Sequence, residues 1–168
     1  MTRLRVTTRS ADETLRLGAA LGLLLEAGDV VALSGPLGAG KTVLVKGLAS
    51  GLGVEAEAVT SPTFTLVHQY RGRLTLFHID AYRLRGAQDM DALGADEILF
   101  GDGATVIEWA DRVSGILPDE RLDVQAEHVN DHSRTFIFRA IGPRYALIVG
   151  KLRKQWRAEL EIRNSKSE

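Results

Sequence analysis

The stretch Gly35-Pro-Leu-Gly-Ala-Gly-Lys-Thr42 decides the fold of this chain. It fits the phosphate-loop pattern G-x-x-x-x-G-K-[ST] at every fixed position. Its glycines allow backbone turns that other residues disfavour, so that N–H groups can approach phosphate oxygens. Lys41 is expected to place its charge between the β and γ phosphates, and the Thr42 hydroxyl to bind Mg²⁺. The expected nucleotide-binding residues of the loop are Gly35, Leu37, Gly38, Ala39, Gly40, Lys41 and Thr42.

The segments on either side of the loop have the pattern that such a site requires. An apolar run at 30–33 is typical of a buried parallel strand. Residues 43–52 carry apolar side chains at helical spacing, and Gly53 is expected to end that helix. A helix that starts here directs free N–H groups and the positive end of its dipole at a bound anion. The strand–loop–helix context therefore predicts a nucleoside-triphosphate site.

Composition narrows the class of protein. The chain has 168 residues and a net charge of −1, so we expect one domain spanning 1–168 and no strong electrostatic footprint for nucleic acid. It contains no cysteine, which excludes disulfides, thiolate metal sites and a thiol nucleophile. The N-terminal residues lack the apolar region of a signal peptide, and no apolar run is long enough to cross a bilayer. We expect a cytoplasmic protein that does not associate with membranes.

The remaining elements predict an α/β fold. Ser10 and Glu13 form a capping box at the start of a helix that is expected to close at Gly28. Residues 65–70 and 74–79 read as an antiparallel hairpin that turns around Gly72. The other expected elements are strands at 4–8, 104–107, 122–127 and 135–140, helical turns at 86–100, and a basic helix at 145–160 followed by a frayed tail at 164–168. We predict a three-layer, P-loop NTPase-like mixed sheet, mainly parallel, flanked by helices.

Two carboxylates are expected to lie beside the phosphate loop. Asp80 and Glu108 each follow a predicted strand, and ligands of open α/β sheets bind at the carboxyl ends of strands. A phosphate-loop enzyme needs a carboxylate near Mg²⁺ and a group that orients the attacking water. We therefore predict that Lys41, Asp80 and Glu108 are catalytic, and that Thr42, Asp80 and Glu108 form the metal site. A helix cap or a surface ion pair is the structural alternative for each carboxylate alone.

Other residues near these positions leave alternatives open. Trp109 fits core packing and a nucleotide or partner surface equally well. His78 is expected to be a satisfied structural histidine. Residues 60–64 lie where loops that sense the γ-phosphate occur, although they could be an ordinary loop. The basic segment 151–157 could contact RNA or a partner, and a solvated helix face is the favoured alternative. Four arginines are candidates for a phosphate clamp: Arg83, Arg85, Arg112 and Arg134.

Four motifs together resemble the TsaE family, whose members are small bacterial ATPases that act in the threonylcarbamoyl modification of tRNA. The resemblance runs from about Ser10 to Gly142. The phosphate loop alone is unspecific, whereas H-x-D-x-Y-R followed by E-W at this distance is highly specific. Pro36, and Ala110 after the tryptophan, depart from the family pattern. The motifs are Gly35-Pro-Leu-Gly-Ala-Gly-Lys-Thr42, Ser61-Pro-Thr-Phe64, His78-Ile-Asp-Ala-Tyr-Arg83 and Ile107-Glu-Trp109.

The resemblance implies a function and a set of partners. It implies weak, Mg²⁺-dependent ATP hydrolysis that becomes productive in a complex with TsaD-like and TsaB-like proteins, which modify the adenosine beside the tRNA anticodon. Contact with tRNA would then be indirect, through the complex. By motif match, Thr63 would belong to the switch, Trp109 would lie beside the nucleotide and Arg134 would border it. The alternatives are a nucleotide-gated binding module with incidental hydrolysis, and a small P-loop kinase.

Overall fold

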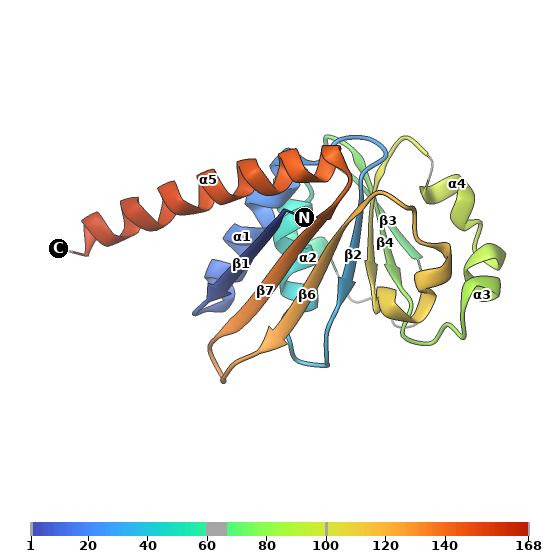
Figure 1. Cartoon of the computed structure of the whole chain (residues 1–168), viewed down its shortest axis with the longest axis horizontal. Coiled ribbons are helices and arrows are strands. Elements are labelled where there is room, and N and C mark those ends of the chain that lie inside the picture. The colour runs from blue at the N-terminus through green and yellow to red at the C-terminus, as the bar shows by residue number, and fades with distance from the viewer. Residues whose placement is uncertain (1, 60–66, 100, 168) are drawn as a thin grey trace.

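The computed structural model describes residues 2–59, 67–99 and 101–167. A seven-stranded sheet lies at its centre, with strand order β1-β7-β6-β2-β5-β4-β3 (Figure 1). The elements in chain order are β1 (Arg3–Thr8), α1 (Ala11–Leu24), β2 (Val30–Ser34), α2 (Lys41–Gly51), η1 (Ala56–Ala58), β3 (Val67–Arg71), β4 (Thr75–Asp80), α3 (Ala87–Ala92), α4 (Ala95–Leu99), β5 (Ala104–Glu108), η2 (Ala110–Ile116), β6 (Arg121–His128), β7 (Arg134–Ile141) and α5 (Pro143–Lys166).

The strand directions confirm the predicted mixed, mostly parallel sheet. β4, β5, β2 and β6 are parallel to one another. β1 shares their direction because it is antiparallel to β7, which is itself antiparallel to β6. β3 and β4 form the predicted antiparallel hairpin. The carboxyl ends of the four central strands therefore meet at one edge of the sheet, where α/β proteins bind ligands.

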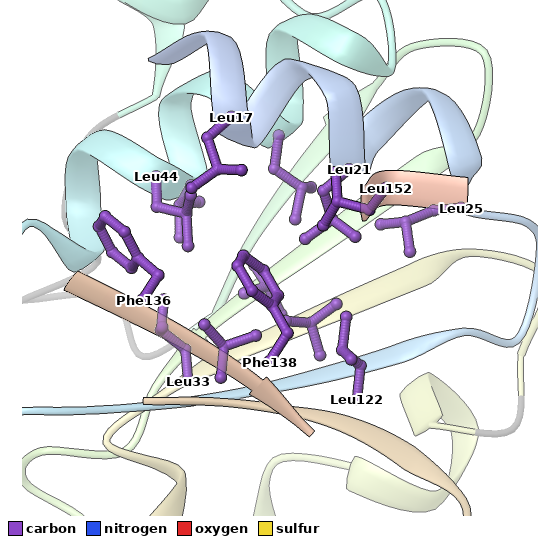
Figure 2. Packing of buried hydrophobic residues seen from close by; sticks show 14 of the residues in the cluster. Leu17, Leu21, Leu25, Leu33, Leu44, Leu122, Phe136, Phe138 and Leu152 are labelled. Carbon is purple, nitrogen blue, oxygen red and sulfur yellow. The ribbon is translucent and has the colours of Figure 1, made fainter. Parts of the chain in front are cut away.

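Helices cover both faces of the sheet, which confirms the three-layer architecture. β2 shows the alternation: Val31 and Leu33 pack into one apolar cluster, whereas Val30 and Ala32 pack into another. The first cluster lies under α1, α2 and α5 and contains the large side chains shown in Figure 2, among them Phe136 and Phe138. The second lies under α3, α4 and η2. A strand buried on both faces explains the continuous apolar run at 30–33.

Helices α1 and α2 cross at very short range because both carry glycines at the crossing. Gly18 and Gly22 of α1 face α2, and Gly47 and Gly51 of α2 face α1. A Cβ atom added at Gly47 would lie 2.9 Å from the carbonyl carbon of Leu15, and one at Gly51 would lie 3.0 Å from the Cα of Gly22. The backbones are thus in direct contact. This crossing fixes the position of α2, whose first residues belong to the phosphate loop.

Two predicted helix ends are wrong in detail. Helix α1 ends at Leu24 rather than at Gly28, because buried Leu25 leaves the helical conformation and a turn closed by Asp29 follows. The Glu13 carboxylate accepts a hydrogen bond from the N–H of Arg9, and the Ser10 hydroxyl caps the helix as predicted.

The last helix is also longer than predicted. α5 continues to Lys166 instead of fraying at 164, and near its end Arg163 forms an ion pair of 3.1 Å with Glu13 of α1. Among the described residues no helix combines the length and apolarity needed to cross a membrane.

Candidate nucleotide site

The phosphate loop joins β2 to α2, as its pattern predicts. Gly35 must be glycine because a Cβ there would collide with the backbone carbonyl of Ala126 on β6. Gly40 has φ +90 and is the N-cap of α2, with no side-chain hydrogen bond to the helix. The N–H groups at the start of any α-helix lack an intrahelical acceptor, and Gly40 has no side chain to accept from them. The first turn contains no acidic residue, so no charge within the helix itself offsets the positive end of its dipole.

Lys41 is folded back onto the loop that carries it. Its side chain is only 7% exposed, and its Nζ donates hydrogen bonds to the carbonyl of Gly35 and, at 2.9 Å, to that of Pro36. The ammonium also lies 3.9 Å from the centroid of the Trp109 ring. Burial lowers the pKa of Lys41, and the negative charges of Glu108 and Asp80 oppose that shift. The Lys41 ammonium is therefore a buried cation enclosed by the phosphate loop.

The two predicted carboxylates face this cation from neighbouring strands. Asp80 and Glu108 are paired in register at the carboxyl ends of β4 and β5, and they are 7% and 2% exposed. The Thr42 hydroxyl donates to Oε1 of Glu108 at 3.4 Å. Burial raises the pKa of Asp80, and the backbone N–H of Tyr82, which donates to Oδ1 at 2.9 Å, opposes that shift. The structure thus brings Lys41, Thr42, Asp80 and Glu108 into one site.

The donor set fits a hard cation only in part. Carboxylate and hydroxyl oxygens are the ligands that Mg²⁺ prefers, and Thr42, Asp80 and Glu108 supply both kinds. Across the described residues, no group of three or more histidine, cysteine, aspartate and glutamate side chains is arranged to hold a metal ion. Mg²⁺ commonly keeps several waters and shares substrate phosphates, so a cage made of protein side chains alone is not required.

His78 lies directly behind Glu108, which the sequence did not indicate. Its side chain is fully buried, and Nε2 is 3.6 Å from Oε2 of Glu108. Neither ring nitrogen has a hydrogen-bond partner within the part of the chain that is described, so the expected satisfied histidine is wrong. The sequence could have placed His78 near the site, because residues two apart in a strand share one face and His78 is two residues before Asp80.

Trp109 has a left-handed backbone and lies over the site. With φ 59 it is the single residue other than glycine with positive φ in the described segments. Its ring contacts that of Tyr82 in a tilted arrangement, with 4.9 Å between centroids and 53° between planes, and the Arg112 guanidinium lies 4.9 Å from the Tyr82 ring. The left-handed conformation costs a bulky residue roughly 1–2 kcal/mol. Trp109 therefore belongs to the surface of the site rather than to the core alone.

A cavity of about 480 Å³ opens in front of these groups. Of the four candidate arginines, Arg134 lines it, and its Nε donates to the carbonyl of Gly38 at 2.8 Å. Arg83 and Arg85 do not line it, and Arg85 pairs with Asp89 at 3.4 Å. The cavity is lined by Leu37, Gly38, Gly40, Lys41, Thr42, Val43, Asp80, Tyr82, Glu108, Trp109 and Arg134.

A second cavity of about 250 Å³ adjoins the first across Gly40 and Arg134. The start of α1 and the β6–β7 turn form its other walls, with Thr14 and His132 among the lining residues. Ala39 does not line either cavity; it is buried, and its N–H donates to the carbonyl of Pro36 at 3.2 Å. Thr63 and the proposed switch at 60–64 lie outside the described residues.

The chain is similar to proteins of one family over most of its length. The family model "Threonylcarbamoyl adenosine biosynthesis protein TsaE" matches residues 8–136. The TsaE protein of Treponema pallidum is 49% identical over 131 residues, which cover 78% of this chain and 96% of that protein. The TsaE protein of Bacillus subtilis is 38% identical over 153 residues, covering 90% of this chain and 95% of that protein.

A solved structure agrees with these relatives. The crystal structure of YdiB from Bacillus subtilis superposes with a TM-score of 0.78 at 34% identity, and the match covers 92% of this chain and 96% of that one. The matched segment 8–136 contains the phosphate loop, both carboxylates and Trp109, and it ends just after Arg134. This chain belongs to the TsaE family of tRNA threonylcarbamoyladenosine biosynthesis proteins.

Proposed function

We propose that this protein binds ATP with Mg²⁺ and hydrolyses it slowly, as an accessory factor in the threonylcarbamoyladenosine modification of tRNA. One observation carries the proposal: Asp80 and Glu108 stand in register beside the phosphate loop, with the Thr42 hydroxyl 3.4 Å from Glu108. A loop for the phosphates, a hydroxyl for the metal and a buried carboxylate for water are the parts that hydrolysis of a γ-phosphate needs.

Each of these residues would have a separate task. Lys41 would leave the Gly35 and Pro36 carbonyls and bind the β and γ phosphates, where its charge offsets the charge that develops on the γ-phosphate oxygens. Thr42 and Asp80 would hold Mg²⁺, directly or through water. A bound Mg²⁺ supplies further neutralisation of the phosphate charge. Glu108 would accept a hydrogen bond from the attacking water and orient it in line with the leaving oxygen.

The two adjoining cavities support a complete nucleotide rather than a lone phosphate. The first contains the phosphate-binding groups, and the second begins at Gly40 and Arg134 and extends toward α1. We propose that the nucleoside lies in the second cavity. Arg134, which lines both, would then contact the phosphates at the junction.

The output of this ATP cycle would be received by other proteins. The family acts in a biosynthetic pathway on tRNA, and by the resemblance the partners would be TsaD-like and TsaB-like proteins. In this proposal the chain does not transfer the threonylcarbamoyl group itself. ATP binding and hydrolysis would instead reset the complex between rounds of modification.

The first test removes the central cation. We expect Lys41→Ala to abolish phosphate release in the complex reconstituted with TsaD-like and TsaB-like proteins. Lys46→Ala is the matched control, because Lys46 lies on the same helix but does not line the cavity. If the Lys41→Ala protein releases phosphate as fast as the Lys46→Ala control, the proposal that this loop binds the phosphates of ATP is wrong.

A second test separates hydrolysis from nucleotide-gated binding. Glu108→Gln keeps the shape of the side chain and removes its charge, so ATP should still bind while its hydrolysis stops. If hydrolysis resets the complex, the variant supports one round of tRNA modification and no more. Sustained modification over many rounds would instead favour the binding module in which hydrolysis is incidental.

A further inference from the structure

We propose that the outward face of α5 binds the phosphate backbone of RNA, through a ridge formed by Lys151, Lys154 and Arg157. This goes beyond the proposed ATPase function and involves a different part of the molecule. The family model ends at residue 136, so the whole of α5 lies outside it. Figure 1 shows α5, in red, running past the edge of the sheet on the side of α1.

Charge is distributed very unevenly between α5 and the rest of the chain. The helix contains seven basic and two acidic residues, a balance of +5, whereas the whole chain has a net charge of −1. Everything outside α5 is therefore acidic on balance. The excess of positive charge is therefore local to α5, and Lys and Arg side chains clustered along a helix are the electrostatic footprint of a nucleic-acid contact.

Six of the seven basic residues of α5 fall into two groups with different surroundings, and the seventh, Lys166, lies in the last turn. Arg144 pairs with Asp29 at 2.8 Å, Arg163 pairs with Glu13 at 3.1 Å, and Arg153 donates to the carbonyl of Arg3; all three are structural contacts to neighbouring elements. Lys151, Lys154 and Arg157, in contrast, are exposed. None of these three forms an ion pair or hydrogen bond with another residue of the described segments.

The spacing of these three residues makes them one ridge. Residues three apart on a helix are neighbours, about 5–6 Å apart at Cβ, so the three positive charges stand in a row on one face. Like charges at this spacing repel each other by roughly 0.2–0.5 kcal/mol per pair. A row of phosphates would remove that repulsion, which favours an anionic ligand with repeated charges.

The opposite face of α5 anchors this ridge to the body of the protein. Leu152 follows Lys151 in the sequence and Trp156 precedes Arg157, and both are on the buried face of the helix. They are 0% and 5% exposed and belong to the main apolar cluster. Ridge residues can therefore be exchanged without disturbing the core. The exposed large apolar side chains of α5 are Leu147, Leu160 and Ile162. The first precedes Lys151 and the other two follow Arg157, so the basic ridge separates them, and RNA fits this face better than an apolar protein partner does.

The test measures binding of the full chain, without nucleotide, to a fluorescently labelled in vitro transcript of a bacterial tRNA by anisotropy. We expect Lys151→Gln/Lys154→Gln/Arg157→Gln to weaken binding by about tenfold or more at 50 mM KCl. The slope of log K against log [KCl] should fall by about 2–3, close to one per lost phosphate contact. ATP hydrolysis by the triple variant should stay at the wild-type level. The outcome of the RNA-binding test is therefore independent of whether the proposed ATPase function is correct.

A pair of double variants controls for net charge. Lys154→Gln/Arg157→Gln should lose binding, whereas Arg71→Gln/Arg85→Gln, which removes the same charge from exposed sites on the β3–β4 side of the sheet, should not. The exchange Lys154→Arg/Arg157→Lys should bind like the wild type. Equal losses in both double variants, an unchanged salt slope, or binding to phosphatidylglycerol vesicles with none to the transcript would each overturn the proposal.

Discussion

The substitution Gly47→Ala tests whether backbone contact between α1 and α2 positions the phosphate loop. In an open helix, replacing glycine by alanine stabilises a protein by about 0.5–1 kcal/mol, because it restricts the unfolded chain. At Gly47 the new Cβ would lie 2.9 Å from the carbonyl carbon of Leu15 and closer still to its oxygen. Carbon atoms at rest are about 3.5–4.0 Å apart, so the helices must separate by roughly 1 Å.

The expected magnitude follows from these two opposed effects. Overpacking of this kind costs typically 1–3 kcal/mol, which exceeds the gain in helix propensity. We expect a net destabilisation of about 1–2 kcal/mol, or a fall in Tm of roughly 2–8 °C for a chain of this size. The separation also displaces the start of α2, so ATP turnover should fall by more than the loss of folded protein explains.

Gly150→Ala is the matched control, since Gly150 lies inside α5 and an added Cβ there has nothing within 4 Å. Its Tm should rise by about 1–4 °C. Differential scanning calorimetry of both variants gives the comparison directly. A Gly47→Ala protein as stable as Gly150→Ala would refute the argument that the crossing is held in backbone contact.

Three further predictions follow from single contacts. Burial raises the pKa of Asp80, so folding disfavours its ionisation. The resulting loss of stability begins as pH rises above the ordinary value of 3.8 and is complete once pH has passed the higher folded-state pKa. Asp80→Asn should therefore raise Tm at pH 7, with no difference from wild type below 3.8, and no gain at pH 7 would contradict this. Tyr145→Phe removes the hydroxyl that accepts the Val30 N–H at 2.9 Å, and by leaving this buried donor unpaired it should cost about 1–3 kcal/mol in urea unfolding. Ser10→Ala removes the cap that accepts the Glu13 N–H at 3.1 Å and should cost about 1 kcal/mol, whereas Ser10→Asp should retain most of it.

Much of the fold could be predicted because its signals are local. The apolar run at 30–33, the loop glycines and the capping Ser10 each act through neighbouring residues, and each was found where expected. Asp80 and Glu108 could be placed together because strand ends in a parallel sheet meet at one edge. The family motifs added specificity that the phosphate loop alone lacks.

The remaining features depend on contacts between distant segments. α5 is docked through Leu152 and Trp156 in the main cluster and through the pairing of Arg163 with Glu13, which are 150 positions apart in the chain and carry no shared local pattern. The strand period places His78 on the same face as Asp80, but the absence of a hydrogen-bond partner for its ring within the described segments depends on the side chains that surround it from other strands. The left-handed backbone at Trp109 likewise runs against residue preference, as is common at functional sites.

The position of α5 has a consequence for the solubility of the protein. β1 is an edge strand, hydrogen-bonded to β7 on one side only. The carbonyl of Thr2 accepts a hydrogen bond from Ala140 of β7. The next carbonyl, that of Arg3, accepts a hydrogen bond from Arg153 of α5. Unpaired strand edges are templates on which a second chain can add a strand and aggregate. α5 occupies part of that edge and contributes Leu152 and Trp156 to the main apolar cluster, so a chain cut after β7 would expose both part of its core and a strand open to self-association.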